Sequence, residues 1–231
     1  MRLKGPIIKP RRVTPKEFGD YLYEMRKLLT LGVLALLVVV FGWWGYRTFQ
    51  AKQEAAAQFM LTDALQMLQR PPEVTAAGQG TEETAKGPDQ ALPLLNQIRE
   101  EYPSSSAAEQ ALLQIGHTLY AMGRYQEALV AYQRYLEKYP KASWVFLAAL
   151  GRAYAMEAQG QYKVAASIFR NLSQRYRGHA LSVEALMGLA RSLQQSQQKE
   201  EAVTVYRGVV EAYPGSIWSR QAEERMALLE R

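Results

Sequence analysis

Residues whose types suit catalysis are few in this sequence and form no recognisable motif. His117 and His179 are the only histidines, and the run Ser104–Ser106 has the pattern of helix capping rather than of a nucleophile. Cysteine is absent, which excludes disulfides, thiolate metal sites and a thiol nucleophile. No glycine-rich phosphate loop follows a strand pattern. We therefore expect a protein that is not an enzyme and that uses no cofactor or metal.

The elements that carry these residues repeat along the chain. The unit Ser104–Pro140 contains two helical patterns joined by a turn at Gly123. A fixed period of about 20–50 residues indicates a solenoid, so we predict an all-α solenoid of helix-turn-helix repeats. The residues that recur every 37 positions are Tyr102, Tyr139, Tyr176 and Tyr213, then Ala128, Ala165 and Ala202, then Tyr132, Phe169 and Tyr206.

Helix ends in this array have sequence signals of their own. Ser106 and Glu109 have the spacing of a capping box for the first helix of their repeat. The final segment, Ser216–Arg231, is half a repeat with one polar face, which the exposed end of a solenoid requires. We predict that it is a C-terminal capping helix whose apolar side consists of Trp218, Ala222, Met226 and Leu229.

The positive charge of the chain is concentrated at its N-terminal end. Residues 1–27 hold eight basic and three acidic residues, a net charge of +5, whereas residues 28–46 hold none. Residues 47–231 hold 20 basic and 19 acidic residues, a net charge of +1. Because phosphate binding needs a basic face and the repeats show none, we expect no nucleic acid partner.

The uncharged run Leu28–Tyr46 predicts a transmembrane helix. Its 19 residues span about 28 Å as a helix, close to the ~30 Å hydrocarbon core of a bilayer. A cleaved signal peptide is the competing interpretation, but its apolar core is usually about 7–15 residues long and ends at a small-x-small site. We favour an uncleaved anchor that contacts the lipid bilayer. The predicted membrane-interface residues are Arg26 and Lys27 on the entry side and Trp43, Trp44 and Tyr46 on the exit side.

The charge before the span also predicts its orientation. Cytoplasmic flanks carry an excess of basic residues, so residues 1–27 are expected in the cytoplasm and the repeats on the other side. In a bacterium, this is a single-pass protein of the inner membrane with its C-terminal domain in the periplasm. Within the tail, Thr14, Pro15 and Glu17 match a helix start. The helix that follows either lies in the membrane interface or docks onto a membrane partner, and its apolar face holds Phe18, Leu22, Met25 and Leu29.

Beyond the span, residues 47–231 are predicted to form the periplasmic domain. No proline or glycine interrupts residues 47–69, so the membrane helix is expected to continue into the first helix of the array. Residues 70–88 hold three prolines and three glycines, which predicts a flexible loop. The helix pattern resumes at Asp89 and completes a first repeat whose turn has been expanded by the loop.

The repeats resemble the tetratricopeptide repeat, and the match covers about residues 89–231. The pattern of that family is filled by Leu112, Ile115, Gly116, Leu119, Ala128, Tyr132 and Pro140, and in the third regular repeat by Leu186, Leu189, Ala190, Leu193, Ala202, Tyr206 and Pro214. The repeat between them departs at Ala149, Arg152 and Arg177. A guanidinium cannot be buried unpaired, so either the stem of Arg152 packs while its head reaches water, or its helix is rotated.

This resemblance implies where a partner would bind. Tetratricopeptide arrays bind extended or helical peptides on the concave face formed by the first helix of each repeat. The implied groove residues are Leu113, His117, Tyr120, Leu150, Tyr154, Glu157, Met187, Arg191 and Gln194. The carboxylate clamp of chaperone-binding arrays is absent, because His117, Tyr154 and Arg191 occupy its characteristic place. These residues either pack or are solvated, or they form a groove for an apolar-aromatic segment.

The layout of the whole chain is similar to that of the YfgM-type ancillary proteins of the bacterial Sec translocon. That resemblance implies a periplasmic scaffold near the translocon, with periplasmic chaperones as further partners. The sequence pattern Tyr-Pro-x-Ser-x-x-Ala also resembles that of periplasmic repeat proteins of the CpoB and BamD kind, which are soluble or lipid-anchored. The absence of cysteine and the full membrane span argue against both. The alternative to a scaffold is a structural subunit of another envelope complex, held through its membrane and cytoplasmic helices.

Overall fold

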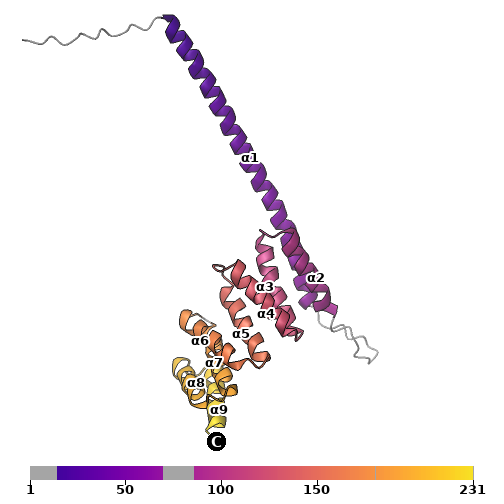
Figure 1. Ribbon diagram of the computed structural model, residues 1–231, viewed down its shortest axis with the longest axis vertical. Helices are drawn as coiled ribbons and strands as arrows, with labels where there is room; N and C mark the ends of the chain where they lie inside the picture. Colours follow the sequence, from indigo (N-terminus) through magenta and orange to yellow (C-terminus); the bar gives the residue numbers. More distant parts are fainter. Residues whose placement is uncertain (1–14, 70–85, 180, 231) are drawn as a thin grey trace, which may run out of the picture. The chain divides into compact units, whose positions relative to one another are not determined.

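The computed structural model describes residues 15–69, 86–179 and 181–230, in which every regular element is an α-helix (Figure 1). These helices are α1 (Pro15–Gln69), α2 (Lys86–Glu101), α3 (Ser106–Ala121), α4 (Tyr125–Lys138), α5 (Val145–Ala158), α6 (Tyr162–Arg175), α7 (Ser182–Gln195), α8 (Lys199–Ala212) and α9 (Ile217–Leu229). The predicted cap at Thr14 and the side chains of Phe18, Leu22, Lys27 and Leu29 lie outside the described residues, as do residues 70–85 of the predicted loop. The last part of that predicted loop, residues 86–88, is helical, because α2 begins at Lys86 and not at Asp89.

The chain divides into two compact units, Met1–Lys52 and Gln53–Arg231. In the first unit, α1 begins at Pro15 and continues through Leu28, so the predicted short helix and the predicted span are one helix. From Thr30 onward this helix is long and apolar enough to cross a membrane, which fits either an anchor or a signal sequence.

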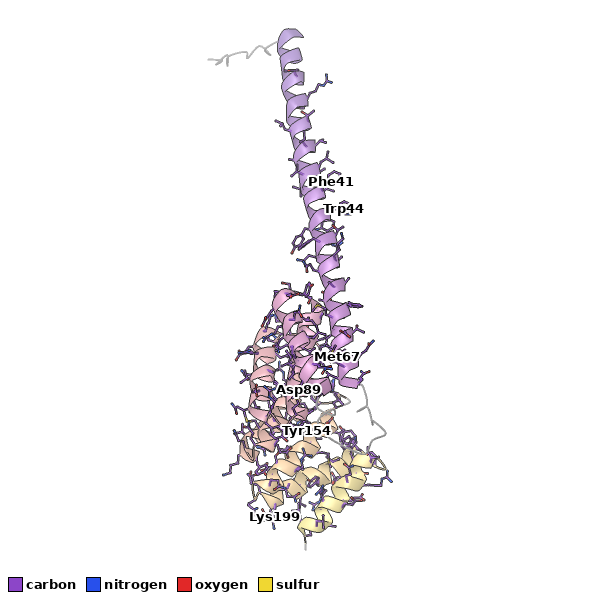
Figure 2. All side chains as sticks on the ribbon, turned by 90° about the vertical axis from the view of Figure 1, so that its right-hand side faces the viewer. Phe41, Trp44, Met67, Asp89, Tyr154 and Lys199 are labelled. Atoms are coloured by element: carbon purple, nitrogen blue, oxygen red, sulfur yellow. The ribbon has the colours of Figure 1, made fainter. Side chains whose placement is uncertain are left out.

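The apolar side chains of the first unit face outward. Trp43, Trp44 and Tyr46 are exposed, as is Arg26, and the guanidinium of Arg47 lies 4.9 Å from the centre of the Trp43 ring. Figure 2 shows the stick side chains of Phe41 and Trp44 projecting from α1. Such an exposed apolar surface is suited to contact with lipid. The membrane-interface role of these residues stays a prediction.

The second unit is an array of helical hairpins built on the predicted period. The end of α1 forms the first pair with α2, because Ala57, Leu61 and Ala64 lie in the same buried cluster as Leu95 and Ile98. The pairs α3–α4, α5–α6 and α7–α8 follow, and α9 packs on α8 as a half repeat. The predicted apolar side of α9 is confirmed, since Ala222 is fully buried and Trp218, Met226 and Leu229 pack against the core.

Large aromatic side chains of the second helices fill the spaces between repeats. Tyr132, Phe169 and Tyr206 are each at most 1% exposed. A β-carbon added to Gly116 would lie 2.6 Å from the ring of Tyr132, and one added to Gly151 of the next repeat would also collide with that ring. The aromatic ring therefore needs a glycine on each side.

The turns inside the repeats require a left-handed backbone. Gly123 and Gly160 have φ of 74° and 75°, and Gln197 occupies the equivalent turn with φ of 65°. Glycine adopts this conformation freely, whereas other residues place their β-carbon against the backbone. The third turn is therefore strained where the first two are not.

The second helices end without needing proline. The backbone N–H of Tyr139 donates to the carbonyl of Tyr135 at 2.8 Å, and that of Tyr176 donates to Leu172 at 3.0 Å. Because α6 ends in the same register as α4 although Arg177 replaces the proline, proline does not set this boundary. The proline only prevents the helix from continuing.

The predicted capping box at Ser106 is wrong by one residue. Ser105 is the N-cap of α3, and its hydroxyl accepts from the backbone N–H of Ala108 at 3.0 Å. Ser106 instead donates through its backbone N–H to Glu54 of α1, and Glu109 accepts a hydrogen bond from the hydroxyl of Tyr135. Burial alone would raise the pKa of Glu54, but hydrogen bonds from Ser106 and neighbouring groups lower it below its usual value.

Arg152 packs its stem and extends its head, the first of the two arrangements that its sequence position allows. Nη1 donates to Oε1 of Gln133 on α4 at 2.7 Å, while the buried Nε has no hydrogen-bond partner among the described residues. The flanking Ala148 and Ala153 are fully buried, so α5 keeps the register of the other first helices. The helix is not rotated.

Candidate protein-binding groove

The first helices α3, α5 and α7 are neighbours and carry the predicted groove residues. One hollow of about 290 Å³ is lined by His117, Tyr120, Leu150 and Tyr154, among others. A second hollow of about 690 Å³ is lined by Tyr120, Tyr154, Glu157 and Arg191, among others. Tyr120 and Tyr154 line both, so the two hollows form one continuous surface, which we call the first-helix groove.

Other predicted groove residues lie beneath this surface or beside it. Leu113, Leu150 and Met187 are 6%, 4% and 8% exposed, so they belong to the core. Leu150 still lines the smaller hollow, whereas Gln194 is half-buried and lines neither. The apolar contribution of the groove therefore comes from ring faces more than from aliphatic side chains.

An ion pair joins α5 to α7 in the groove wall. Nε and Nη2 of Arg191 donate to the two carboxylate oxygens of Glu157 at 2.8 and 2.6 Å, and the hydroxyl of Ser192 donates to the same carboxylate at 3.2 Å. The hydrogen bond to Glu157 raises the pKa of Arg191, with burial acting in the opposite direction. Both charges are satisfied within the protein, so this wall presents little net charge to a partner.

Tyr154 is fixed from three directions. Its hydroxyl donates to Oε1 of Glu184 at 2.8 Å, its ring lies 5.3 Å from that of Phe169, and the guanidinium of Arg191 lies 5.6 Å from its ring centre. Burial raises the pKa of Tyr154, and the hydrogen bond to Glu184 adds to the shift. The side chain therefore offers a rigid, neutral aromatic surface.

His117 is a packed side chain. Its ring lies 5.7 Å from the Tyr132 ring, and Nδ1 is 3.2 Å from Oε1 of Gln114. Burial lowers the pKa of His117, which favours the neutral imidazole. Among the described residues, no three His, Asp or Glu side chains are grouped as a metal site.

Several groove residues escaped the sequence analysis, among them Tyr162 and Leu181. Tyr162 begins α6 and lines the larger hollow, and Leu181 precedes α7 and lines the smaller one. Tyr162 follows Gly160 as Tyr125 follows Gly123, and the ring of Tyr125 lies 5.3 Å from that of Tyr120. This recurrence of tyrosine two residues after the turn glycine was the signal that could have identified it.

Known proteins with this fold are numerous. The MamA protein (residues 41 to the end) of Desulfovibrio magneticus RS-1 is 17% identical, with a TM-score of 0.57, over 75% of this chain and 82% of that one. A tetratricopeptide repeat protein from Parabacteroides merdae ATCC 43184 is 16% identical, with a TM-score of 0.59, over 76% of this chain and 60% of that one. At such identities these likenesses show the fold alone.

Comparison of the sequence with curated proteins gave no match. A family model does match, over residues 75–231, which include the helices α2 to α9 and so most of the chain. The protein thus has a tetratricopeptide-like fold. The chain belongs to the YfiO family, whose description is outer membrane lipoprotein.

Proposed function

We propose that this protein is a membrane-anchored scaffold that holds other proteins in the first-helix groove. The observation that carries the proposal is the groove itself, in which Tyr120 and Tyr154 join two hollows across α3, α5 and α7. Ordered aromatic side chains give a large contact area at a low cost in conformational entropy, and for this reason they dominate protein interfaces. The side chains that line the groove do not form a catalytic arrangement.

The chemistry of the groove favours a neutral segment with apolar or aromatic side chains. Glu157 and Arg191 neutralise one another, and Glu184 already accepts a hydrogen bond from the hydroxyl of Tyr154. A charged partner group would have to break one of these pairs and would leave a half-buried charge unpaired. An apolar side chain between the tyrosine rings breaks none of them.

We further propose that α1 anchors the array to the bacterial inner membrane, with the array in the periplasm. The positive charge of residues 1–27 supports this orientation, and the exposed apolar surface of α1 supports the anchor. The family description refers to a lipoprotein, but the 231 residues contain no cysteine, so we assign the anchoring to α1. The layout of the chain supports a place beside the Sec translocon, with periplasmic chaperones among the partners.

Copurification from gently solubilised membranes tests the scaffold proposal. Tyr120→Ala combined with Tyr162→Ala should remove translocon or chaperone components from the purified complex, because both side chains line the groove. Phe59→Ala is the matched control, since Phe59 is 77% exposed and lies outside both hollows. Circular dichroism should show that all variants are equally helical.

The alternative is a structural subunit of another envelope complex, held through its membrane and cytoplasmic helices. Deletion of residues 1–27 separates the two functions. If partners are lost on that deletion and retained in the tyrosine variant, the groove is not the binding site and the structural role is correct. Reporter fusions after Arg231 would reveal a cytoplasmic array, which would contradict the proposed location.

A further inference from the structure

A second groove lies on the other side of the helix pairs, between α2 and α4. Its volume is about 530 Å³, and its floor is formed by Leu112, Ile115 and Leu119 of α3. Short turns join α3 to both α2 and α4, so α2 and α4 run in the same direction and form parallel walls. We call it the α2/α4 groove. Further lining residues are Asp89, Leu92, Arg99, Val130 and Arg134.

The equivalent gap between α6 and α8 is bridged. Arg170 of α6 forms an ion pair with Glu201 of α8, which ties the two second helices together. The residues 74 positions earlier, two full periods, are Asn96 and Glu127. Asn96 donates to the carbonyl of Leu92 in its own helix at 2.9 Å. Among the described residues, Glu127 bonds only to Arg124 of its own repeat.

Asn96 and Glu127, the two residues that could bridge the α2/α4 groove, thus bond to side chains of their own repeats instead. Glu127 accepts from Nε and Nη2 of Arg124 at 2.7 and 2.6 Å, and Oδ1 of Asn96 accepts from Arg99 at 3.0 Å. Between α4 and α6, the floor residue Arg152 bonds to Gln133 and so fills the space. Among the described second helices, α2 and α4 are the pair whose gap keeps an apolar floor with no bridge across it.

The charges of this groove are separated along its length. Asp89 lies in the first turn of α2, and the Arg124–Glu127 pair lies at the start of α4, which is the same end because the walls are parallel. Arg99 and Arg134 lie near the C-terminal ends of the two walls. Arg134 has no ion-pair or hydrogen-bond partner among the described residues, so one end of the groove is basic and open to a carboxylate. Asp89, labelled in Figure 2, belongs to the opposite, N-terminal end of α2.

We propose that the α2/α4 groove binds an amphipathic α-helix of a partner protein, with acidic residues at the end that meets Arg99 and Arg134. The floor residues form a helical stripe at spacings of three and four residues and are at most 6% exposed, so they are a packed base over which the ridge of another helix can lie between the walls. Val130, 44% exposed on the wall, gives this helix an accessible apolar contact. Carboxylates on the partner give Arg134 the counter-charge that it lacks among the described residues, and they add to the exposed Glu100 that lies 3.7 Å from Arg99.

Synthetic helices test this binding on the full chain held in lipid nanodiscs. The first probe is a fluorescent peptide with leucines at i, i+3, i+7 and i+10 and glutamates in one terminal turn. The second is the same peptide with lysines replacing those glutamates. Fluorescence anisotropy should show about tenfold tighter binding of the glutamate peptide, because only that peptide complements the two arginines.

Substitutions in the protein then locate the peptide. Val130→Lys should weaken binding of the glutamate peptide about tenfold. Val164→Lys is the matched control, because Val164 is also a 44%-exposed valine on a second helix but lies outside the α2/α4 groove, and it should leave binding unchanged. Arg134→Glu should exchange the preference, so that the lysine peptide becomes the tighter ligand.

Several results would overturn the proposal. Equal binding of the two peptides, no binding of either, or equal effects of Val130→Lys and Val164→Lys would each show that the groove does not read an acidic helix. If the chain self-associates and Val130→Lys abolishes this, the occupant is a second copy. If the peptide binds only after residues 70–85 are replaced by a short glycine-serine linker, the occupant is that segment. Because these measurements do not involve the first-helix groove, its proposed function stands or fails separately.

Discussion

The ring of Phe169 on α6 fills the space in which any other residue at Gly188 of α7 would place its β-carbon. That carbon would lie 2.6 Å from Cε1 of the ring. Phe169 is fully buried, so the ring cannot move aside without opening the core. The close approach of α6 and α7 therefore depends on this pair.

Gly188→Ala should lower the free energy of unfolding by about 1–3 kcal/mol, the usual cost of overpacking a core. Gly208→Ala is the control, because no atom outside its own helix surroundings lies within 4 Å of the added carbon. At this exposed position in α8, alanine should stabilise the protein by about 0.5–1 kcal/mol. Chemical denaturation measures both, and a neutral Gly188→Ala would contradict the packing described.

Gln197→Gly should stabilise the protein by about 0.5–1 kcal/mol. The left-handed turn strains glutamine, and the relief of about 1–2 kcal/mol exceeds the entropy cost of glycine. The reverse change, Gly160→Gln, places the same residue in the equivalent turn and should destabilise to a similar extent. Thermal unfolding by circular dichroism checks the pair, and shifts in the same direction would refute the strain argument.

Arg152→Leu should raise the free energy of unfolding by about 1–2 kcal/mol, because it removes the buried Nε that has no partner and adds apolar surface. Gln133 is exposed and loses only one hydrogen bond, which water can replace. Arg170→Leu is the comparison, since it removes an exposed ion pair with Glu201 and should cost no more than about 1 kcal/mol. Loss of stability in Arg152→Leu would mean that the bond to Gln133 outweighs the orphaned Nε.

The stability of the array should depend on pH through His117. Its pKa is lowered in the folded state by burial, from an ordinary value of 6.5. The unfolded chain therefore binds more protons below pH 6.5, so stability is full above that pH and falls as the pH drops toward the lower folded pKa. His117→Gln should flatten this slope in denaturation series from pH 7.5 to 5.5. The exposed His179 provides the control, because His179→Gln should retain the slope.

Two ion pairs of the same bidentate form should differ in coupling energy. Arg191–Glu157 joins two helices and its carboxylate is 12% exposed, whereas Arg124–Glu127 lies within one repeat with its carboxylate 56% exposed. A double-mutant cycle on the first should give about 0.5–1.5 kcal/mol after allowance for the exposed guanidinium. The second should give a smaller coupling because water screens both groups. Equal couplings would mean that burial does not decide the strength of these pairs.

The repeat architecture was predictable because its signals recur. Ala128, Tyr132 and their equivalents lie at a fixed spacing, and the structure buries every one of them. The repeat pattern identified only one of the glycines that the rings require. All three lie inside helices, where glycine normally weakens the helix, but Gly116 occupies a small-residue position of the repeat pattern, whereas Gly151 and Gly188 do not. Their role depends on a ring from the preceding repeat, which no local pattern reports.

The candidate sites were less predictable because they depend on how side chains pair. A position on the first helix does not reveal that Leu113 is buried or that Arg191 and Glu157 neutralise one another. The sequence did not predict the α2/α4 groove for a similar reason. It exists because Asn96 and Glu127 bond within their own repeats, and a sequence pattern cannot distinguish such a bond from one that crosses the gap.

The buried core of the array consists of two clusters that meet at α5. Ala148 belongs to the first, while Phe146 and Leu150 of the same helix belong to the second. The first-helix groove crosses this seam, because Tyr120 packs on the first cluster and Tyr154 on the second. A segment bound across both would contact the two clusters at once, so its binding free energy should stabilise both halves of the array together.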